Sequence, residues 1–139
     1  MAEINWKHEF SVNIPKLDKQ HKTLLSMVNE LSDAIDQEQS DSITGEIVSR
    51  LSLYAITHFS DEERFMERYG FTELPSHREE HATFVEQIET FKEQLLCDQS
   101  ILARDVLIYL MNWFMHHIMS VDQKYAEFFT EKQMLHGVS

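Results

Sequence analysis

Four stretches of the chain carry apolar side chains at steps of three and four residues, the spacing at which side chains share one face of an α-helix. These stretches predict helices over about 18–37, 42–69, 75–97 and 101–132. Amphipathic helices joined by short connections bury their apolar faces against one another. We therefore expect an all-α fold, an antiparallel up-down-up-down four-helix bundle, with 1–139 forming one domain.

The first 17 residues predict an extended arm instead of a helix. Their apolar side chains are spaced irregularly, and Pro15 cannot stand inside a helix. A flexible tail rarely carries so much apolar surface, so we expect the arm, 1–17, to lie on the bundle. Asp18 is a suitable N-cap for the first helix, and Gly70 stands where the second helix needs a left-handed C-cap.

Each predicted helix carries, inside its apolar stripe, side chains that bind transition metals. They are His21 in the first helix, His58 and Glu62 in the second, His77 and His81 in the third, and His117 and Asp122 in the fourth. A single histidine in such a stripe is more often a core residue bonded to a carbonyl group. Glu62 is the stronger signal, because a buried carboxylate costs several kcal/mol unless it is paired or metal-bound. Its neighbours Asp61 and Glu63 fall off the stripe and are expected to stay in water.

The alternative to a metal site is a buried, pH-sensitive network of histidines and carboxylates. Such a network would stabilise a core poorly, and four helices with ligands at compatible heights favour metal binding. Five imidazoles, two bridging carboxylates and one bridging solvent oxygen fill all but one position of two octahedral ions. The nitrogen-rich, sulfur-free set favours iron, with manganese, cobalt and zinc as alternatives.

One vacant position suits one small exogenous ligand. The apolar residues that we expect to line it, although each is also a typical core residue, are Phe59, Trp113, Phe114 and Ile118. No free acid, base or nucleophile stands in the stripes near the site, which argues against hydrolysis and demanding redox catalysis. The pattern therefore favours reversible capture of a small neutral molecule.

The fourth helix presents two difficulties. His116 and His117 are adjacent, and His117 continues the apolar stripe better. Asp122 follows His117 by five residues, which is about 140° around a regular helix. We therefore predict a π-type turn between His117 and Asp122.

The combined pattern resembles the hemerythrin family, specifically its single-domain bacterial form, over nearly the whole chain. The matching pieces are Trp6 with the following arm, Leu17-Asp18-Lys19-Gln20-His21-Lys22, His58-Phe59-x-x-Glu62, His77-x-x-x-His81 and Trp113-Phe114-x-x-His117-Ile118-x-x-x-Asp122-x-x-Tyr125. The resemblance also favours His117 over His116.

This resemblance implies an oxo- or hydroxo-bridged pair of iron ions. By it, one iron would be held by His77, His81 and His117, the other by His21 and His58, and both would be bridged by Glu62 and Asp122. It implies reversible dioxygen binding for carriage, storage or delivery, and not an enzyme. Phe114 stands where family members often have leucine, and its bulkier ring would alter oxygen release or autoxidation.

Two other functions remain open. A sensor of oxygen, nitric oxide or redox state would need an output such as a partner, and a di-iron enzyme would show peroxidase or nitric oxide reductase activity. The expected partners are dioxygen and, for a delivery protein, an oxygen-using enzyme.

The charge balance excludes several classes of partner. The chain has 12 basic and 24 acidic residues, a net charge of −12, which repels phosphate backbones and anionic lipid. We therefore expect no nucleic acid partner and no membrane insertion. The single cysteine, Cys97, permits no intramolecular disulfide, so a reducing cytoplasm is expected. Burial of the four stripes leaves no large apolar face, so we expect a monomer.

Overall fold

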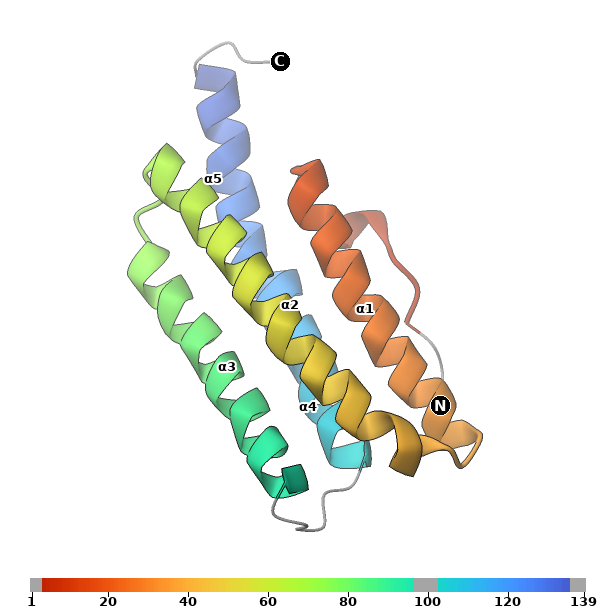
Figure 1. The fold of residues 1–139 in the computed structure, drawn as a ribbon. Coiled ribbons are helices and arrows are strands. Elements are labelled where there is room, and N and C mark those ends of the chain that lie inside the picture. The colour runs from red at the N-terminus through yellow and green to blue at the C-terminus, as the bar shows by residue number, and fades with distance from the viewer. Residues whose placement is uncertain (1–3, 97–102, 136–139) are drawn as a thin grey trace.

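The computed structural model of the chain describes residues 4–96 and 103–135. Four long helical segments alternate in direction along the sequence (Figure 1). They are α1 (Pro15–Asp36), α2 (Ser40–Tyr69), α3 (Leu74–Leu96) and a fourth composed of α4 (Ala103–Trp113), the π-helix η2 (Phe114–Val121) and α5 (Asp122–Leu135). The expected up-down-up-down four-helix bundle is confirmed. None of the described helices is both long and apolar enough to cross a lipid bilayer.

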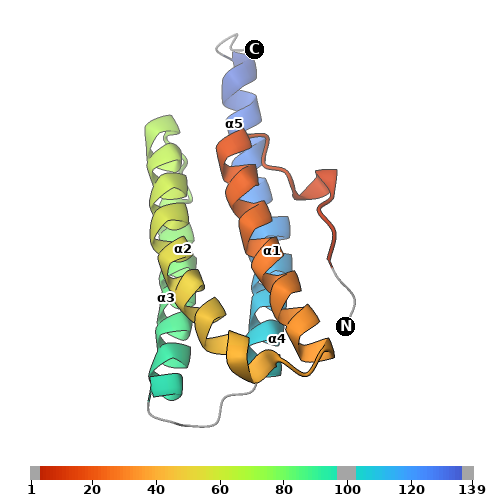
Figure 2. The ribbon, with the colours of Figure 1, turned by 45° about the vertical axis from the view of Figure 1, so that its right-hand side comes forward.

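The helices form two packed layers. α1 packs on α2 and on α4, and α2 packs on α3. Figure 2 shows α1 in front of the α4–α5 segment and α2 in front of α3. Every helix therefore turns one face toward the interior between the two layers. In this arrangement the four predicted apolar stripes meet.

The start of α1 differs from the prediction. The helix begins at Pro15, whose missing N–H suits the first helical position, and not at Asp18. The Asp18 carboxylate accepts hydrogen bonds from the Ser11 hydroxyl at 2.5 Å and the Val12 N–H at 2.8 Å. Asp18 therefore ties the arm to the first turn of α1, and the prediction that it caps the helix was wrong.

The other helix ends lie within a few residues of their expected positions. α2 begins at Ser40 and ends at Tyr69, followed by Gly70 in the left-handed conformation at φ 69°, as predicted. α3 begins at Leu74, and α5 extends to Leu135. Cys97 lies outside the described residues.

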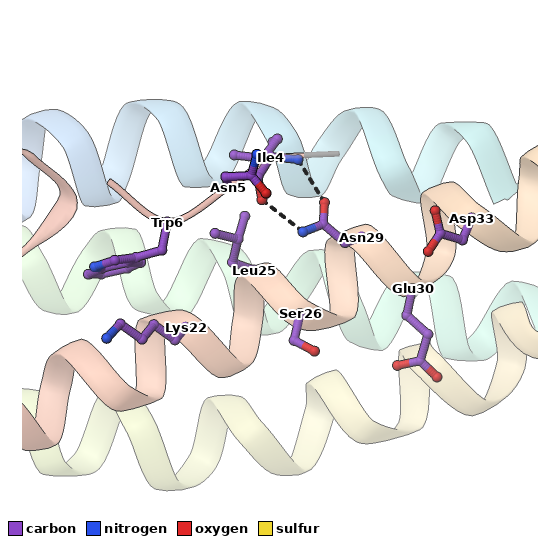
Figure 3. A pocket seen from close by; sticks show the side chains of 9 residues that line it. All are labelled: Ile4, Asn5, Trp6, Lys22, Leu25, Ser26, Asn29, Glu30 and Asp33. Atoms are coloured by element: carbon purple, nitrogen blue, oxygen red, sulfur yellow. Dashed lines mark hydrogen bonds between the residues drawn. The ribbon is translucent and has the colours of Figure 1, made fainter. Parts of the chain in front are cut away.

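The described part of the N-terminal arm, residues 4–14, lies on the bundle, as expected. It contains one 3-10 turn, η1 (His8–Phe10), and one left-handed residue, Asn13 at φ 63°. Its apolar anchors Phe10, Val12 and Ile14 are buried. The Asn29 side chain accepts from the Ile4 N–H at 2.9 Å and donates to the Ile4 carbonyl at 2.8 Å (Figure 3). Two hydrogen bonds with the Asn29 side chain, one accepted and one donated, thus hold Ile4 against α1.

The core consists of two apolar clusters at different heights in the bundle. The larger includes Leu24, Ala55, Phe84 and Phe114, one from each helical segment. The smaller includes Leu17, Met66, Leu74 and Tyr125, again one from each segment. In α1, α2 and α3 the predicted ligand residues fall between these positions in sequence, so a polar layer lies between two apolar ones.

Candidate metal centre

The seven ligand-type residues come together in this polar layer. Each exposes 3% or less of its surface: His21, His58, Glu62, His77, His81, His117 and Asp122. The remaining described histidines, His8 and His116, are exposed. In the fourth helical segment His117 is buried and His116 is exposed, in agreement with the predicted preference for His117.

Helical periodicity brings most of these side chains inward. His58 and Glu62 are four residues apart on α2, as are His77 and His81 on α3, and residues so spaced share a helix face. His117 and Asp122 need the wider turn of η2, in which the Asp122 N–H donates to the His117 carbonyl. The predicted π-type turn is confirmed, and it extends over Phe114–Val121.

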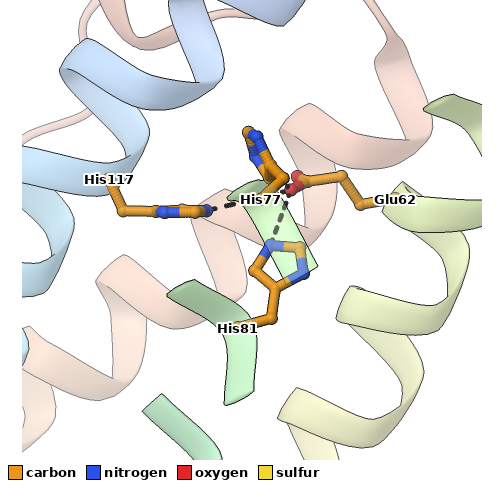
Figure 4. Close-up of side chains that lie close together, drawn as sticks. All are labelled: Glu62, His77, His81 and His117. Atoms are coloured by element: carbon orange, nitrogen blue, oxygen red, sulfur yellow. Dashed lines mark hydrogen bonds and ion pairs between the residues drawn. The ribbon is translucent and has the colours of Figure 1, made fainter. Parts of the chain in front are cut away.

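The Glu62 carboxylate divides the five imidazoles into two groups. Its Oε2 atom lies 3.3 Å from Nε2 of both His21 and His58. Its Oε1 atom faces the other three, at Nε2 distances of 3.0 Å to His81, 3.2 Å to His77 and 3.9 Å to His117. Figure 4 shows the second group, with rings from α3 and η2 converging on the carboxylate from α2.

The Asp122 carboxylate spans the same two groups. Its Oδ2 atom lies 3.4 Å from Nε2 of His21. Its Oδ1 atom lies 2.6 Å from Nε2 of His77 and 3.2 Å from Nε2 of His117. Each carboxylate thus offers one oxygen to a two-histidine group and one to a three-histidine group, which is the donor arrangement that two carboxylate-bridged metal ions require.

Two atoms at the centre of the site lack hydrogen bonds among the described residues. Nε2 of His117 and Oδ2 of Asp122 are buried and form none within the described part of the chain. The Nε2 atoms of His21 and His58 face each other at 3.1 Å. A buried polar atom without a partner costs about 1–3 kcal/mol. Cations placed at the site would use the lone pairs of His117 Nε2 and Asp122 Oδ2, which the described protein atoms leave unsatisfied.

Without a metal, the carboxylates draw protons onto some of the imidazoles. Burial lowers the pKa of His77, but hydrogen bonds to Asp122 and Glu62 outweigh burial and raise it to about 9. Burial lowers the pKa of His58, and the neighbouring Glu62 does not fully offset it. Metal binding at neutral pH would therefore have to displace a proton from the His77 ring.

Three of the imidazoles are held through their outer nitrogen atoms. The Nδ1 atoms contact side-chain oxygens of three residues, Gln20 at 2.6 Å from His58, Glu63 at 2.7 Å from His81 and Glu80 at 3.4 Å from His117. When Nδ1–H donates to such an oxygen, Nε2 keeps its lone pair for a metal. Gln20, Glu63 and Glu80 thus orient the rings toward the centre of the site.

These three orienting residues were not among the predicted site residues. Glu63 was expected to be merely solvated, and its contact with His81 shows that this was wrong. Asp61, which was also expected to be solvated, accepts a hydrogen bond from the Gln20 amide at 2.9 Å. The sequence signal that could have identified two of the orienting residues is their position next to a predicted ligand, since Gln20 precedes His21 and Glu63 follows Glu62.

Aromatic rings cover the site unevenly. The rings of Phe59 and His81 stack at 3.9 Å, and those of Trp113 and His117 at 4.2 Å, so both cover the three-histidine group. Two further residues of the expected pocket, Phe114 and Ile118, are buried in the larger apolar cluster. At the two-histidine group, the ring of Tyr54 stacks on His58 at 5.2 Å and that of Phe59 lies tilted at 5.6 Å from it; Tyr54 was not among the predicted pocket residues. Its buried hydroxyl has no hydrogen-bond partner among the described residues.

Comparison with known proteins places the chain in a family. Residues 12–129 match the Hemerythrin HHE cation binding domain. Bacteriohemerythrin of Clostridium acetobutylicum is 30% identical over 88% of this chain and 98% of its own length. Myohemerythrin of Theromyzon tessulatum is 29% identical over 86% of this chain and 88% of its own length. The crystal structure of wild-type hemerythrin matches at a TM-score of 0.81 and 28% identity, covering 91% of this chain and 97% of that chain. The chain therefore belongs to the hemerythrin family.

Proposed function

We propose that this chain binds dioxygen reversibly at a buried pair of iron ions. The observation that carries the proposal is the division of both carboxylates between a two-histidine and a three-histidine group. A single iron ion could use only one of the two histidine groups. Two ions would use both groups and both oxygens of each carboxylate. The relatives' membership of the hemerythrin family supports iron over the other first-row metals.

The donor set fits such a pair. We assign the ligands as His77, His81 and His117 for one iron, His21 and His58 for the other, and Glu62 and Asp122 for both. The unsatisfied buried atoms of His117 and Asp122 support this assignment. A bound iron pair would supply the electrons for the capture of dioxygen, and the two-histidine group would offer one imidazole fewer than the three-histidine group.

The protein's own contribution is to hold the imidazoles and exclude water. Gln20, Glu63 and Glu80 fix the tautomer and orientation of three rings through Nδ1. Apolar clusters above and below the polar layer separate it from solvent. A dry, apolar environment disfavours charged competitors and limits the access of protons to the site.

The test is spectroscopic. The chain is loaded with ferrous iron under argon, and its absorbance is followed through repeated cycles of oxygen and argon. A reversible change with two irons per chain is expected. The matched variants are His117→Ala, which should abolish the change, and His116→Ala, which alters an exposed neighbour and should preserve it. Absence of a reversible change in the unaltered protein would contradict the proposal.

We further propose a carrier, storage or delivery role instead of catalysis. The two buried carboxylates, Glu62 and Asp122, both contact imidazoles, so neither is a free general acid or base. Turnover of peroxide or nitric oxide by the iron-loaded chain should not exceed that of free iron. A rate well above free iron would replace the carrier role with an enzymatic one.

A further inference from the structure

Outside the metal centre, a cavity lies where α1 begins and α2 ends. Figure 1 shows these two helix ends at the same end of the bundle. The volume of the cavity is about 220 Å³. We call it the α1–α2 groove, and it is lined by Ile14, Lys16, Leu17, Asp61, Arg64, Phe65 and Arg68.

The floor of the α1–α2 groove is apolar and closely packed. Ile14 and Leu17 are buried in the smaller apolar cluster. The Phe65 ring packs against Tyr69 at 4.9 Å and Phe129 at 5.1 Å between ring centroids. Because these contacts hold the floor in place, a small apolar group can bury surface there without reorganising the helices.

The rim of the groove is cationic in an acidic protein. Three basic residues face one carboxylate, whereas the whole chain has 12 basic and 24 acidic residues. That carboxylate, Asp61, is already engaged by the Gln20 amide at 2.9 Å and the Lys16 ammonium at 3.5 Å. An excess of positive charge therefore remains at the rim.

The two guanidinium groups supply that excess. Arg64 donates to the Ser60 hydroxyl at 3.3 Å, and Arg68 lies over the Tyr69 ring at 5.7 Å. Within the described residues, neither group forms an ion pair with a carboxylate. Their planar donors match a carboxylate group geometrically, as a lysine ammonium does not.

We propose that the α1–α2 groove binds a small organic carboxylate with a short apolar body. The body would lie on Ile14, Leu17 and Phe65, and its carboxylate would face Arg64 and Arg68. A cavity of about 220 Å³ has room for a short chain of carbon atoms. The net charge of −12 penalises each further negative charge, so a monoanion fits better than a dianion.

Calorimetry with the iron-loaded full chain tests this proposal, with hexanoate as the probe. Hexylammonium and hexanol carry the same apolar body without the negative charge. Hexanoate should bind saturably at one site per chain, and more tightly than either analogue. No saturable binding of hexanoate, or equal binding of hexylammonium, would overturn the proposal.

Two double variants locate the site. The change Arg64→Gln with Arg68→Gln should weaken hexanoate binding by at least about tenfold. The change Arg50→Gln with Arg104→Gln removes the same charge elsewhere and should alter binding by less than about twofold. Arg64, Arg68 and Arg104 are exposed and Arg50 is half-exposed in an ion pair with Glu30, so circular dichroism should show unchanged helicity. Equal losses in both double variants would mean that the attraction is not local to the groove, and the site would be rejected.

Discussion

Replacing Glu62 by glutamine removes the one charge that faces all five imidazoles while keeping the shape of the side chain. Its Oε1 atom lies 3.0 Å from His81 and its Oε2 atom 3.3 Å from His58, so both iron positions depend on it. We expect the Glu62→Gln chain to bind both irons more weakly. A neighbouring carboxylate, Glu63, and an exposed one, Glu67, provide graded comparisons on the same helix.

The size of the effect follows from the contacts. An interaction with a charged group contributes about 1.5–3 kcal/mol and a neutral one about 0.5–1.5 kcal/mol. Loss of that difference at both oxygens of Glu62 amounts to about 2–3 kcal/mol, or about 30- to 150-fold in affinity. Glu63→Gln weakens one outer contact, to His81, and should cost about tenfold. Glu67→Gln, at an exposed side chain, should cost nothing measurable.

The assay is an anaerobic titration with ferrous iron in competition with a coloured chelator. Circular dichroism of each metal-free variant checks that the helices remain formed. The order of affinity loss should be Glu62, then Glu63, then Glu67. Wild-type affinity in Glu62→Gln, or a larger loss in Glu63→Gln, would refute the assignment of Glu62 as the central bridging carboxylate.

Three further predictions concern other parts of the molecule. Burial raises the pKa of Tyr54 well above 10.0, so the native state keeps a proton that the unfolded chain loses, and stability should fall as pH rises above about 10. In urea unfolding between about pH 9 and 11, Tyr54→Phe should reduce the fall of the free energy of unfolding with pH. If the fall is as steep in the variant as in the wild type, another group causes it. Deletion of the half-exposed Met115 should restore α-helical register in η2 and turn Asp122 away from His117 by about 100°. Iron content should then fall with helicity retained, and full iron content would show that the π-helix is dispensable. Gly70→Ala should lower the melting temperature by a few degrees, because the left-handed conformation at φ 69° costs an L-residue about 1–2 kcal/mol. The added Cβ would meet open space, so the backbone conformation is the only source of this cost. An unchanged melting temperature would mean that the turn relaxes to another conformation.

Much of the metal centre was predictable because its rules are local. The four-residue spacing of His58 and Glu62 puts both on one helix face, and a carboxylate in an apolar stripe requires a partner. The five-residue step from His117 to Asp122 violates α-helical geometry, and only a wider turn reconciles it with a shared site. These inferences need the covalent order of the residues and the pitch of a helix, and no knowledge of neighbouring helices.

Local rules failed where two segments compete for one group. Asp18 has the chemistry of an N-cap, yet it binds Ser11 and Val12, because the arm passes beside the first turn of α1. Glu63 lies off the apolar stripe, yet it holds His81 from the adjacent helix, 18 residues away. In both cases the deciding partner comes from a part of the chain whose position depends on packing.

The amino-acid sequence by itself determined the four helices, the residue types of the metal centre and the family to which the chain belongs. The tertiary structure alone decided which oxygen faces which imidazole, and which aromatic ring covers which group. The contacts of Gln20 with His58 and of Glu80 with His117 join residues 38 and 37 positions apart. The rotation and height of each helix set such distances, and these depend on how the two apolar clusters pack above and below the site.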